Sequence, residues 1–194
     1  DRIEAGTYMI AAAATNGRVA IKNIEPKIIS KEISLLKRIG VKIIEKKKKI
    51  TILGSKNLKN INIKTSPYPG FPTDLQAQLM VLMCKAKNKS IIEENIFENR
   101  FMHVSELNRM GANIIVKGRK AIINGNKKLN GAQLMATDLR ASVSLVIAAL
   151  ISSKKSVINR IYHLDRGYEN IEKKLSACGA IIKRIKWKKL VINY

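Results

Sequence analysis

The sequence predicts an α/β fold, of the α+β kind, in which three β-α-β-α-β-β repeats pack together around their central helices. Three parallel stretches of the chain, opening at Asp1, Asp74 and Asp138, follow the same order of elements. The first helix of each stretch is apolar on almost every side, as in "MIAAAA", "LMVLM" and "SLVIAALI", and such helices are buried. We expect one domain over residues 1–194, with repeats at about 1–60, 61–127 and 128–194.

The first half of each repeat is predicted to be a helix followed by a strand. An aspartate opens the apolar helix, and a short polar turn, "ATNG", "KAKNK" or "ISSKK", ends it. A segment rich in β-branched residues follows, with the sequences "RVAIKNI", "SIIEENI" and "SVINRIY". The order of helix, turn and strand is therefore expected three times.

The second half of each repeat is predicted to hold an amphipathic helix and a hairpin. Apolar residues recur at helical spacing, for example at Ile33 and Leu36. The helix is expected to end at Gly40, Gly111 and Gly179, because glycine adopts the left-handed cap at little cost. Two strands close each copy, and "INIKTS" and "LNGAQLMA" supply a leading strand before the second and third copies.

The chain is strongly basic, with a formal net charge of +23 that lies mostly on lysines spread along its length. A basic surface attracts polyanions, so a nucleic-acid-binding module is one alternative function. Aromatic residues make up only 5% of the chain, however, and no nucleic-acid-binding motif is present. The lysine-rich segments "EKKKKI" (45–50) and "IKWKKL" (185–190) are expected to be exposed faces of hairpins. We expect no specific nucleic-acid partner.

The two cysteines, Cys84 and Cys178, lie far apart and give neither a disulfide framework nor a metal-ligand spacing. We expect both to be core residues, and we expect no metal, no cofactor and a cytoplasmic location. A hydrophobic content of 46% with 26% charged residues is typical of a globular chain. No apolar run approaches the length of a membrane span, so no membrane partner is expected.

The stretch "FPTDLQAQ" (71–78) allows two interpretations of Asp74. Thr73 and Gln76 have the spacing of a capping box, which would leave the carboxylate of Asp74 spare at the first helical position. A carboxylate there is stabilised by the helix dipole, which is one explanation of its presence. The alternative is a general base facing a cleft. The residues alone favour helix capping for Asp1, Asp74 and Asp138.

Four long blocks resemble one enzyme family over the whole chain: "FPTDLQAQ", "FENRFMHVSELNRMGA", "LNGAQLMATDLRAS" and "RIYHLDRGYENIEKKLSACGA". They are similar to the C-terminal half of the UDP-N-acetylglucosamine 1-carboxyvinyltransferases, the enolpyruvyl transferases that open peptidoglycan synthesis. The resemblance implies an inside-out α/β bundle, with sheets outward and helices inside, that forms one of two similar domains. It also implies a missing N-terminal catalytic domain as partner, which would supply most uridine contacts and the acid that protonates C3 of phosphoenolpyruvate.

The resemblance implies a transfer of the enolpyruvyl group of phosphoenolpyruvate to the 3-hydroxyl of UDP-N-acetylglucosamine. It assigns Asp74, beside Thr73, to the sugar and to the role of base. It assigns Asp138 to proton handling or site organisation, Arg140 to the same motif, and Arg166 to contact with phosphoenolpyruvate.

Two further positions have weaker assignments. Ile96 matches a position whose backbone meets the UDP-sugar, with no side-chain chemistry implied. Arg100 occupies the same place in the second repeat as Arg166 in the third, and either a ligand contact or an ion pair with Glu98 or Glu106 is expected. The histidines at 103 and 163 are expected to pack or to form hydrogen bonds, because neither has a second ligand nearby in sequence.

Three rival interpretations remain open at this stage. The shikimate-pathway enolpyruvyl transferase shares the repeat, although "FENRFMHV" and "HLDRGYE" are not expected in it. The basic nucleic-acid-binding module is the second, and a remnant that folds but has lost its partner half is the third. If the resemblance holds, we expect the chain by itself to bind substrate weakly and to turn nothing over.

Overall fold

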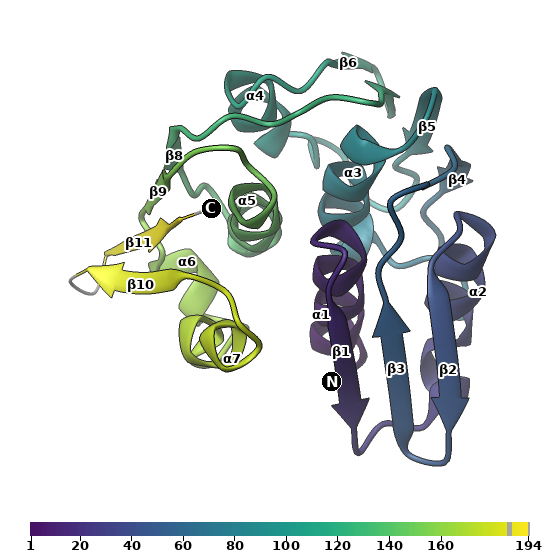
Figure 1. Cartoon of the computed structure of the whole chain (residues 1–194). Helices are drawn as coiled ribbons and strands as arrows, with labels where there is room; N and C mark the ends of the chain where they lie inside the picture. The colour runs from purple at the N-terminus through teal and green to yellow at the C-terminus, as the bar shows by residue number, and fades with distance from the viewer. Residues whose placement is uncertain (186–187, 194) are drawn as a thin grey trace.

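The computed structural model describes residues 1–185 and 188–193, which form three units with their helices inside and their sheets outside (Figure 1). The first unit has the predicted order of helix, strand, helix and hairpin. Its elements are α1 (Arg2–Ala14), β1 (Arg18–Lys22), η1 (Pro26–Ile29), α2 (Ser30–Arg38), β2 (Lys42–Lys46) and β3 (Lys49–Leu53).

The second and third units each add the predicted leading strand. The second unit holds β4 (Asn62–Lys64), η2 (Thr73–Leu75), α3 (Gln76–Lys85), β5 (Lys89–Glu93), α4 (His103–Arg109), β6 (Ile114–Lys117) and β7 (Lys120–Asn124). The third holds β8 (Gln133–Met135), α5 (Leu139–Leu150), β9 (Ser156–Asn159), α6 (Tyr162–Asp165), α7 (Ile171–Ala177), β10 (Ile182–Ile185) and β11 (Lys189–Ile192). The three-repeat α/β fold is confirmed, whereas the assignment of residues 1–194 to one domain stays a prediction.

The three sheets share one strand order. The first is β1-β3-β2, the second is β4-β5-β7-β6, and the third is β8-β9-β11-β10. The hairpin strands pair antiparallel, while β4 and β8 run parallel to β5 and β9 at the sheet edge. Only the first sheet has no leading strand among the described residues.

The core forms around α1, α3 and α5, which carry few polar residues and are buried along most of their length. α3 packs against both α1 and α5, and each of these helices also packs against its own sheet. Burying such apolar surface is the main favourable term in folding. In the described part of the chain, no helix is both long enough and apolar enough to cross a membrane.

Glycine ends the amphipathic helix of each unit, as predicted. Gly40, Gly111 and Gly179 have φ values of 99°, 93° and 97°, in the region that other residues rarely adopt. The helix can therefore stop and the chain can turn directly into the hairpin.

Cys84 is buried as predicted, but Cys178 is exposed, because its helix α7 packs less deeply than the central helices. In the segment 45–50, residues 45–48 are exposed at the β2–β3 turn as predicted, whereas Ile50 is buried in β3. The segment 185–190 falls partly outside the described residues, at 186 and 187.

Candidate functional site

Asp74 does not cap a helix. It lies in the 3-10 turn η2, which follows Pro72 and leads into α3. The predicted capping box is wrong, because the Thr73 hydroxyl donates to the Glu94 carboxylate at 2.8 Å and neither η2 nor α3 has a side-chain cap. The Gln76 side-chain nitrogen, which the box would have used, is buried without a partner. The carboxylate of Asp74 is therefore available for other contacts.

Two arginines from different units contact that carboxylate. Arg140, at the start of α5, donates from Nε to Oδ1 of Asp74 at 2.6 Å. Arg100, which follows β5, approaches the same oxygen at 3.7 Å and lies over the Phe97 ring at 4.2 Å. The predicted alternative for Arg100, an ion pair with Glu98 or Glu106, is wrong, since these two residues pair with other arginines. Oδ2 of Asp74 accepts no hydrogen bond from the described residues.

The three units meet at a cavity of about 150 Å³, which we call the central hollow. It lies where the N-terminal ends of α1 and α5 and the η2 turn converge. The guanidinium of Arg140 favours an anion there, whereas Asp1 and Asp138 already cap the N-terminal ends of α1 and α5. The residues that line the central hollow are Asp1, Ile3, Glu4, Asp74, Leu139, Arg140, Gly167 and Tyr168.

Arg166 directly precedes Gly167, which lines the central hollow, and it follows the short helix α6. Its side chain is exposed and forms no ion pair or hydrogen bond with the described residues. The structure therefore leaves its guanidinium free to bind an anion.

One buried hydrogen-bond network joins all three units, and it includes Tyr168, which lines the central hollow. The Thr7 hydroxyl donates to the Ile3 carbonyl at 2.9 Å, so its oxygen accepts from the Tyr168 hydroxyl at 2.8 Å and from Gln78 at 3.2 Å. Gln78 also donates to the backbone carbonyl of Asp74 at 2.9 Å. Burial raises the pKa of Tyr168, which keeps the hydroxyl protonated as a donor.

A second buried group, Glu94, was not identified from the sequence. Its carboxylate is 1% exposed and accepts from the hydroxyls of Thr65 and Thr73 and from the backbone N–H groups of Ile96 and Phe97. Glu94 therefore ties the turn before Asp74 to the loop after β5. The only sequence signal for it was an acidic pair at a strand end.

The other two aspartates of the repeat are helix caps. Asp1 accepts from the N–H groups of Ile3 and Glu4, and Asp138 accepts from those of Arg140 and Ala141. Asp138 also lies close enough to the buried His103 for its charge to oppose the effect of burial, which lowers the pKa of that imidazole to about 4. The predicted role of Asp138 in proton handling stays a proposal, while its role in fixing the start of α5 beside Arg140 is clear.

The loop after β5 opens a second cavity, of about 640 Å³, next to the central hollow. Ile96 lies in the same loop, after the end of β5, but it does not line this cavity. Its N–H is bound to Glu94, and its carbonyl has no described partner. Exposed Phe97 and Met102 give this cavity an apolar wall, and Arg100 lies between the two cavities. Among the described residues, no group of three or more His, Cys, Asp or Glu side chains could hold a metal ion.

The inside-out bundle of three α/β units is the fold of solved enolpyruvyl transferases. The enolpyruvyl transferase NikO from Streptomyces tendae has a similar structure, with a TM-score of 0.84 and 25% identity, over 100% of this chain and 45% of NikO. An EPSP synthase from Acinetobacter baumannii shares the fold at a TM-score of 0.71 and 17% identity, over 97% of this chain and 44% of the synthase.

The chain belongs to the family of EPSP synthase (3-phosphoshikimate 1-carboxyvinyltransferase), whose sequence model matches residues 1–175. Among curated relatives, the UDP-N-acetylglucosamine 1-carboxyvinyltransferase of Pelagibacter ubique (strain HTCC1062) is 70% identical over 185 residues, which are 95% of this chain. The enzyme of the same name from Geotalea daltonii is 57% identical over the same share. The chain spans 44% of the length of each of these two relatives.

Proposed function

We propose that residues 1–194 carry half of the active site of a UDP-N-acetylglucosamine 1-carboxyvinyltransferase. In this reaction the enolpyruvyl group of phosphoenolpyruvate moves to the 3-hydroxyl of UDP-N-acetylglucosamine, the first committed step of peptidoglycan synthesis. The observation that carries the proposal is the carboxylate of Asp74, which faces the central hollow with one oxygen on two arginines and the other unoccupied. Relatives that are 70% and 57% identical bear this name.

Asp74 is the proposed general base. A sugar hydroxyl is weakly acidic and needs a positioned acceptor for its proton. Oδ2 of Asp74 accepts that proton as the hydroxyl oxygen forms a bond to C2 of phosphoenolpyruvate, while C3 gains a proton from an acid outside residues 1–194. Loss of a proton from C3 and of phosphate from C2 then yields the enolpyruvyl ether. Gln78 holds the backbone carbonyl of Asp74 at 2.9 Å and so helps to fix the base in place.

The arginines are proposed to hold the anionic groups of phosphoenolpyruvate. Arg140 already binds a carboxylate, that of Asp74, in a charge-assisted hydrogen bond of 2.6 Å. A bound phosphate or carboxylate would compete for this guanidinium and release Oδ1 of Asp74 as well. Arg166 has no described partner and is proposed as a second contact to phosphoenolpyruvate.

The loop after β5 is proposed to meet the nucleotide-sugar. Its backbone carbonyl at Ile96 is unoccupied, and Thr73 and Arg100 flank the approach to Asp74. The remaining uridine contacts and the acid for C3 are proposed to come from a partner domain, since the curated relatives are more than twice as long. Because the two cysteines are unpaired, we also propose a reducing cytoplasmic setting.

The rival substrate, 3-phosphoshikimate, is less well supported. The family description names it, but the solved EPSP synthase structure is only 17% identical to this chain. The 70% identical relative bears the name of the enzyme that uses the nucleotide-sugar. This difference supports the nucleotide-sugar as the proposed substrate.

A chimera tests the proposal. This chain would replace the matching 44% of the Pelagibacter ubique relative, and phosphate release from phosphoenolpyruvate would be followed with either acceptor. We expect turnover with UDP-N-acetylglucosamine and none with shikimate 3-phosphate. Asp74→Asn should lower kcat by on the order of 10²- to 10⁴-fold, the usual contribution of a general base.

The matched control is Glu45→Gln, which removes an exposed carboxylate paired with Lys37 far from the central hollow. Its kcat should equal that of the parent chimera. An Asp74→Asn chimera with unchanged kcat would refute the base assignment, and turnover with shikimate 3-phosphate alone would refute the proposed acceptor.

A further inference from the structure

The first sheet turns one side toward α1 and α2 and the other side away from the molecule. Ile43, Ile50 and Ile52 are buried on the helix side, while the alternate residues of the same strands are exposed or half-buried. In Figure 1 the three strands lie in front of both helices, and no other described element lies over them. We call this open side of β1, β3 and β2 the outer face.

The strand register arranges the side chains of the outer face in three rows. From one end of the strands to the other, the rows are Arg18, Leu53 and Lys42; Ala20, Thr51 and Ile44; and Lys22, Lys49 and Lys46. The outer face therefore carries five cationic side chains and no acidic one.

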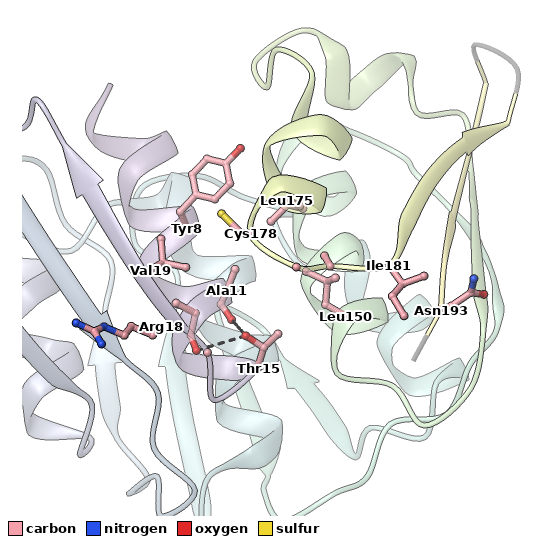
Figure 2. A pocket seen from close by; sticks show the side chains of 14 residues that line it. Tyr8, Ala11, Thr15, Arg18, Val19, Leu150, Leu175, Cys178, Ile181 and Asn193 are labelled. Carbon is pink, nitrogen blue, oxygen red and sulfur yellow. Dashed lines mark hydrogen bonds between the residues drawn. The ribbon is translucent and has the colours of Figure 1, made fainter.

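These five cations have no counter-charge within the described part of the chain. No ion pair or side-chain hydrogen bond joins any of them to a described residue. The one acidic residue in the three strands, Glu45, bonds to Lys37 of α2 at 2.6 Å on the helix side. Figure 2 shows the Arg18 side chain on the opposite side of β1 from that of Val19, which lines a cavity toward the third unit. The charge of the outer face is thus open to an external anion.

The third row is unfavourable for the sheet by itself. It places Lys22, Lys49 and Lys46 directly opposite one another on three neighbouring strands. Side chains in such positions are about 5 Å apart at Cβ, and like charges there destabilise a sheet. The β2–β3 turn adds Lys47 and Lys48, both exposed, at the same end. Anions bound against this row would remove the repulsion.

The equivalent rows of the other two sheets lack this imbalance. In the second sheet the row is Lys64, Glu93, Lys120 and Lys117. Its carboxylate pairs with the lysines on both sides, at 3.4 Å and 3.8 Å. In the third sheet the row holds one lysine, at 189, between an asparagine and an isoleucine. The uncompensated row is therefore a property of the first sheet and not of the repeat.

We propose that the outer face binds the surface of a lipid bilayer that carries anionic phospholipids. Basic side chains near such a surface are attracted by its negative potential. The first and third rows are four residues apart, or about 13 Å at about 3.3 Å per residue, so a flat sheet brings both to the lipid phosphates together. Ile44, which is 41% exposed between these rows, enters the boundary between head groups and acyl chains.

A nucleic acid fits the outer face less well. None of its nine side chains is aromatic, so it offers no platform on which a base could stack. Its middle row is neutral and partly apolar, which suits lipid but gives nothing to a phosphate backbone. Lipid head groups also move laterally, so that each cation can obtain its own phosphate. Membrane binding of this kind needs no spanning helix, and it does not depend on the proposed function.

Sedimentation with lipid vesicles tests the proposal. We expect residues 1–194 to bind vesicles of phosphatidylglycerol and phosphatidylcholine in equal parts, and not vesicles of phosphatidylcholine alone. The triple variant Lys22→Gln, Lys46→Gln and Lys49→Gln should lower the partition coefficient by on the order of 10²-fold, because each basic residue near an anionic surface contributes about fivefold. Binding should also weaken as salt rises.

The matched control is the triple variant Lys64→Gln, Lys117→Gln and Lys120→Gln, which has the same net charge and alters the equivalent row of the second sheet. It should bind less than about threefold more weakly than the parent chain, through long-range attraction alone. Equal losses in the two triple variants, or no binding to anionic vesicles, would overturn the proposal. Binding of a DNA duplex that the first triple variant abolishes, without vesicle binding, would make the outer face a nucleic-acid surface and would also overturn it.

A footprint on the unaltered chain tests the same face without relying on the folding of a variant. Lysines would be acetylated with and without anionic vesicles, and the rate at each position would be read by mass spectrometry. Vesicles should slow acetylation of Lys22, Lys46 and Lys49 several-fold more than that of Lys64 and Lys117. Equal protection at all five positions would show that the chain binds without a preferred face, and the proposal would be wrong.

Discussion

Three aspartates stand at equivalent places of the three repeats, and their carboxylates have different uses. Asp1 and Asp138 cap α1 and α5, whereas Asp74 enters its helix through a 3-10 turn and bonds to Arg140. The sequence identified Asp74 by resemblance, but it could not show the partners. Arg140 and Arg100 come from separate elements, and their meeting depends on how the units pack.

Glu94 is the residue on which we expect the geometry near Asp74 to depend most. Glu94→Gln replaces one of the two acceptor oxygens by an NH2 group. That group cannot accept the hydrogen bonds that the carboxylate oxygen accepts. Leaving buried donors unsatisfied costs about 1–3 kcal/mol, and we expect a loss of that size in the free energy of unfolding. Denaturant titration measures it, with Glu93→Gln as control, because Glu93 makes only longer contacts to Lys64 (3.4 Å) and Lys120 (3.8 Å). Equal losses in both variants would contradict a special role for Glu94.

His103 makes stability depend on pH in a defined direction. Burial lowers its pKa to about 4, against 6.5 for an ordinary histidine, and Asp138 partly opposes this change. The unfolded chain therefore binds a proton below pH 6.5 that the folded chain does not bind until about pH 4. The free energy of unfolding is therefore highest above pH 6.5. It falls as the pH drops, by on the order of 2 kcal/mol between about pH 7.5 and pH 5.

Urea titrations at the two pH values, with His103→Gln for comparison, measure this effect. The variant lacks the imidazole, so its stability should change much less over the interval. The same decrease in both proteins would show that other groups cause it.

At the scale of elements, Arg184 of β10 holds the two ends of the segment that carries Arg166. Its guanidinium donates to Asp165 at 3.0 Å and 2.7 Å and to Glu172 at 3.0 Å. Hydrogen bonds to these two carboxylates raise the pKa of Arg184, so it is always charged. A planar fork that bridges α6 and α7 in this way fixes geometry that a lysine cannot reproduce.

Arg184→Lys should therefore loosen the segment between α6 and α7 while it keeps the charge. We expect hydrogen exchange at the Tyr168 amide to quicken by about three- to tenfold, with little change in the global free energy of unfolding. Lys37→Ala, which removes a surface pair with Glu45, is the control and should leave that amide unchanged. Unchanged exchange in Arg184→Lys would show that the clamp does not order the segment.

The helices and strands that follow a repeated pattern were predictable, since the apolar helix, the glycine stop and the hairpin each recur three times. The short helix α6 was not, because "YHLD" has no apolar period of its own and is held by Arg184 from a distant strand. Arg166 directly follows this helix, so its position also depends on that contact. Elements such as α6, which the local sequence does not predict, depend on contacts between residues far apart in the chain.

At the scale of the whole molecule, the site exists only where all three units meet. Thr7 belongs to the first unit, Gln78 and Asp74 to the second, and Tyr168 and Arg140 to the third. The repeat predicted the architecture, because each unit needs the others to bury its central helix. It could not predict the network, whose members are not at equivalent positions in the three repeats.

The central hollow is lined by Asp74, the proposed base, and by Arg140, but its volume of about 150 Å³ is small for a nucleotide-sugar together with phosphoenolpyruvate. We therefore expect residues 1–194 alone to release no phosphate from the two substrates above the rate without protein. Binding of phosphoenolpyruvate should still be measurable by titration, and it should weaken as salt rises, because exposed charges are screened.

A coupled phosphate-release assay on the isolated chain, with the active chimera as positive control, decides the point. Arg166→Ala should weaken the salt-sensitive binding of phosphoenolpyruvate, because no described residue competes with the ligand for the guanidinium of Arg166. Lys46→Ala, which removes an exposed charge in the β2–β3 hairpin, should not. Clear turnover by the isolated chain would mean that these 194 residues contain a complete site, and that the acid for C3 lies among side chains to which no such role has been assigned.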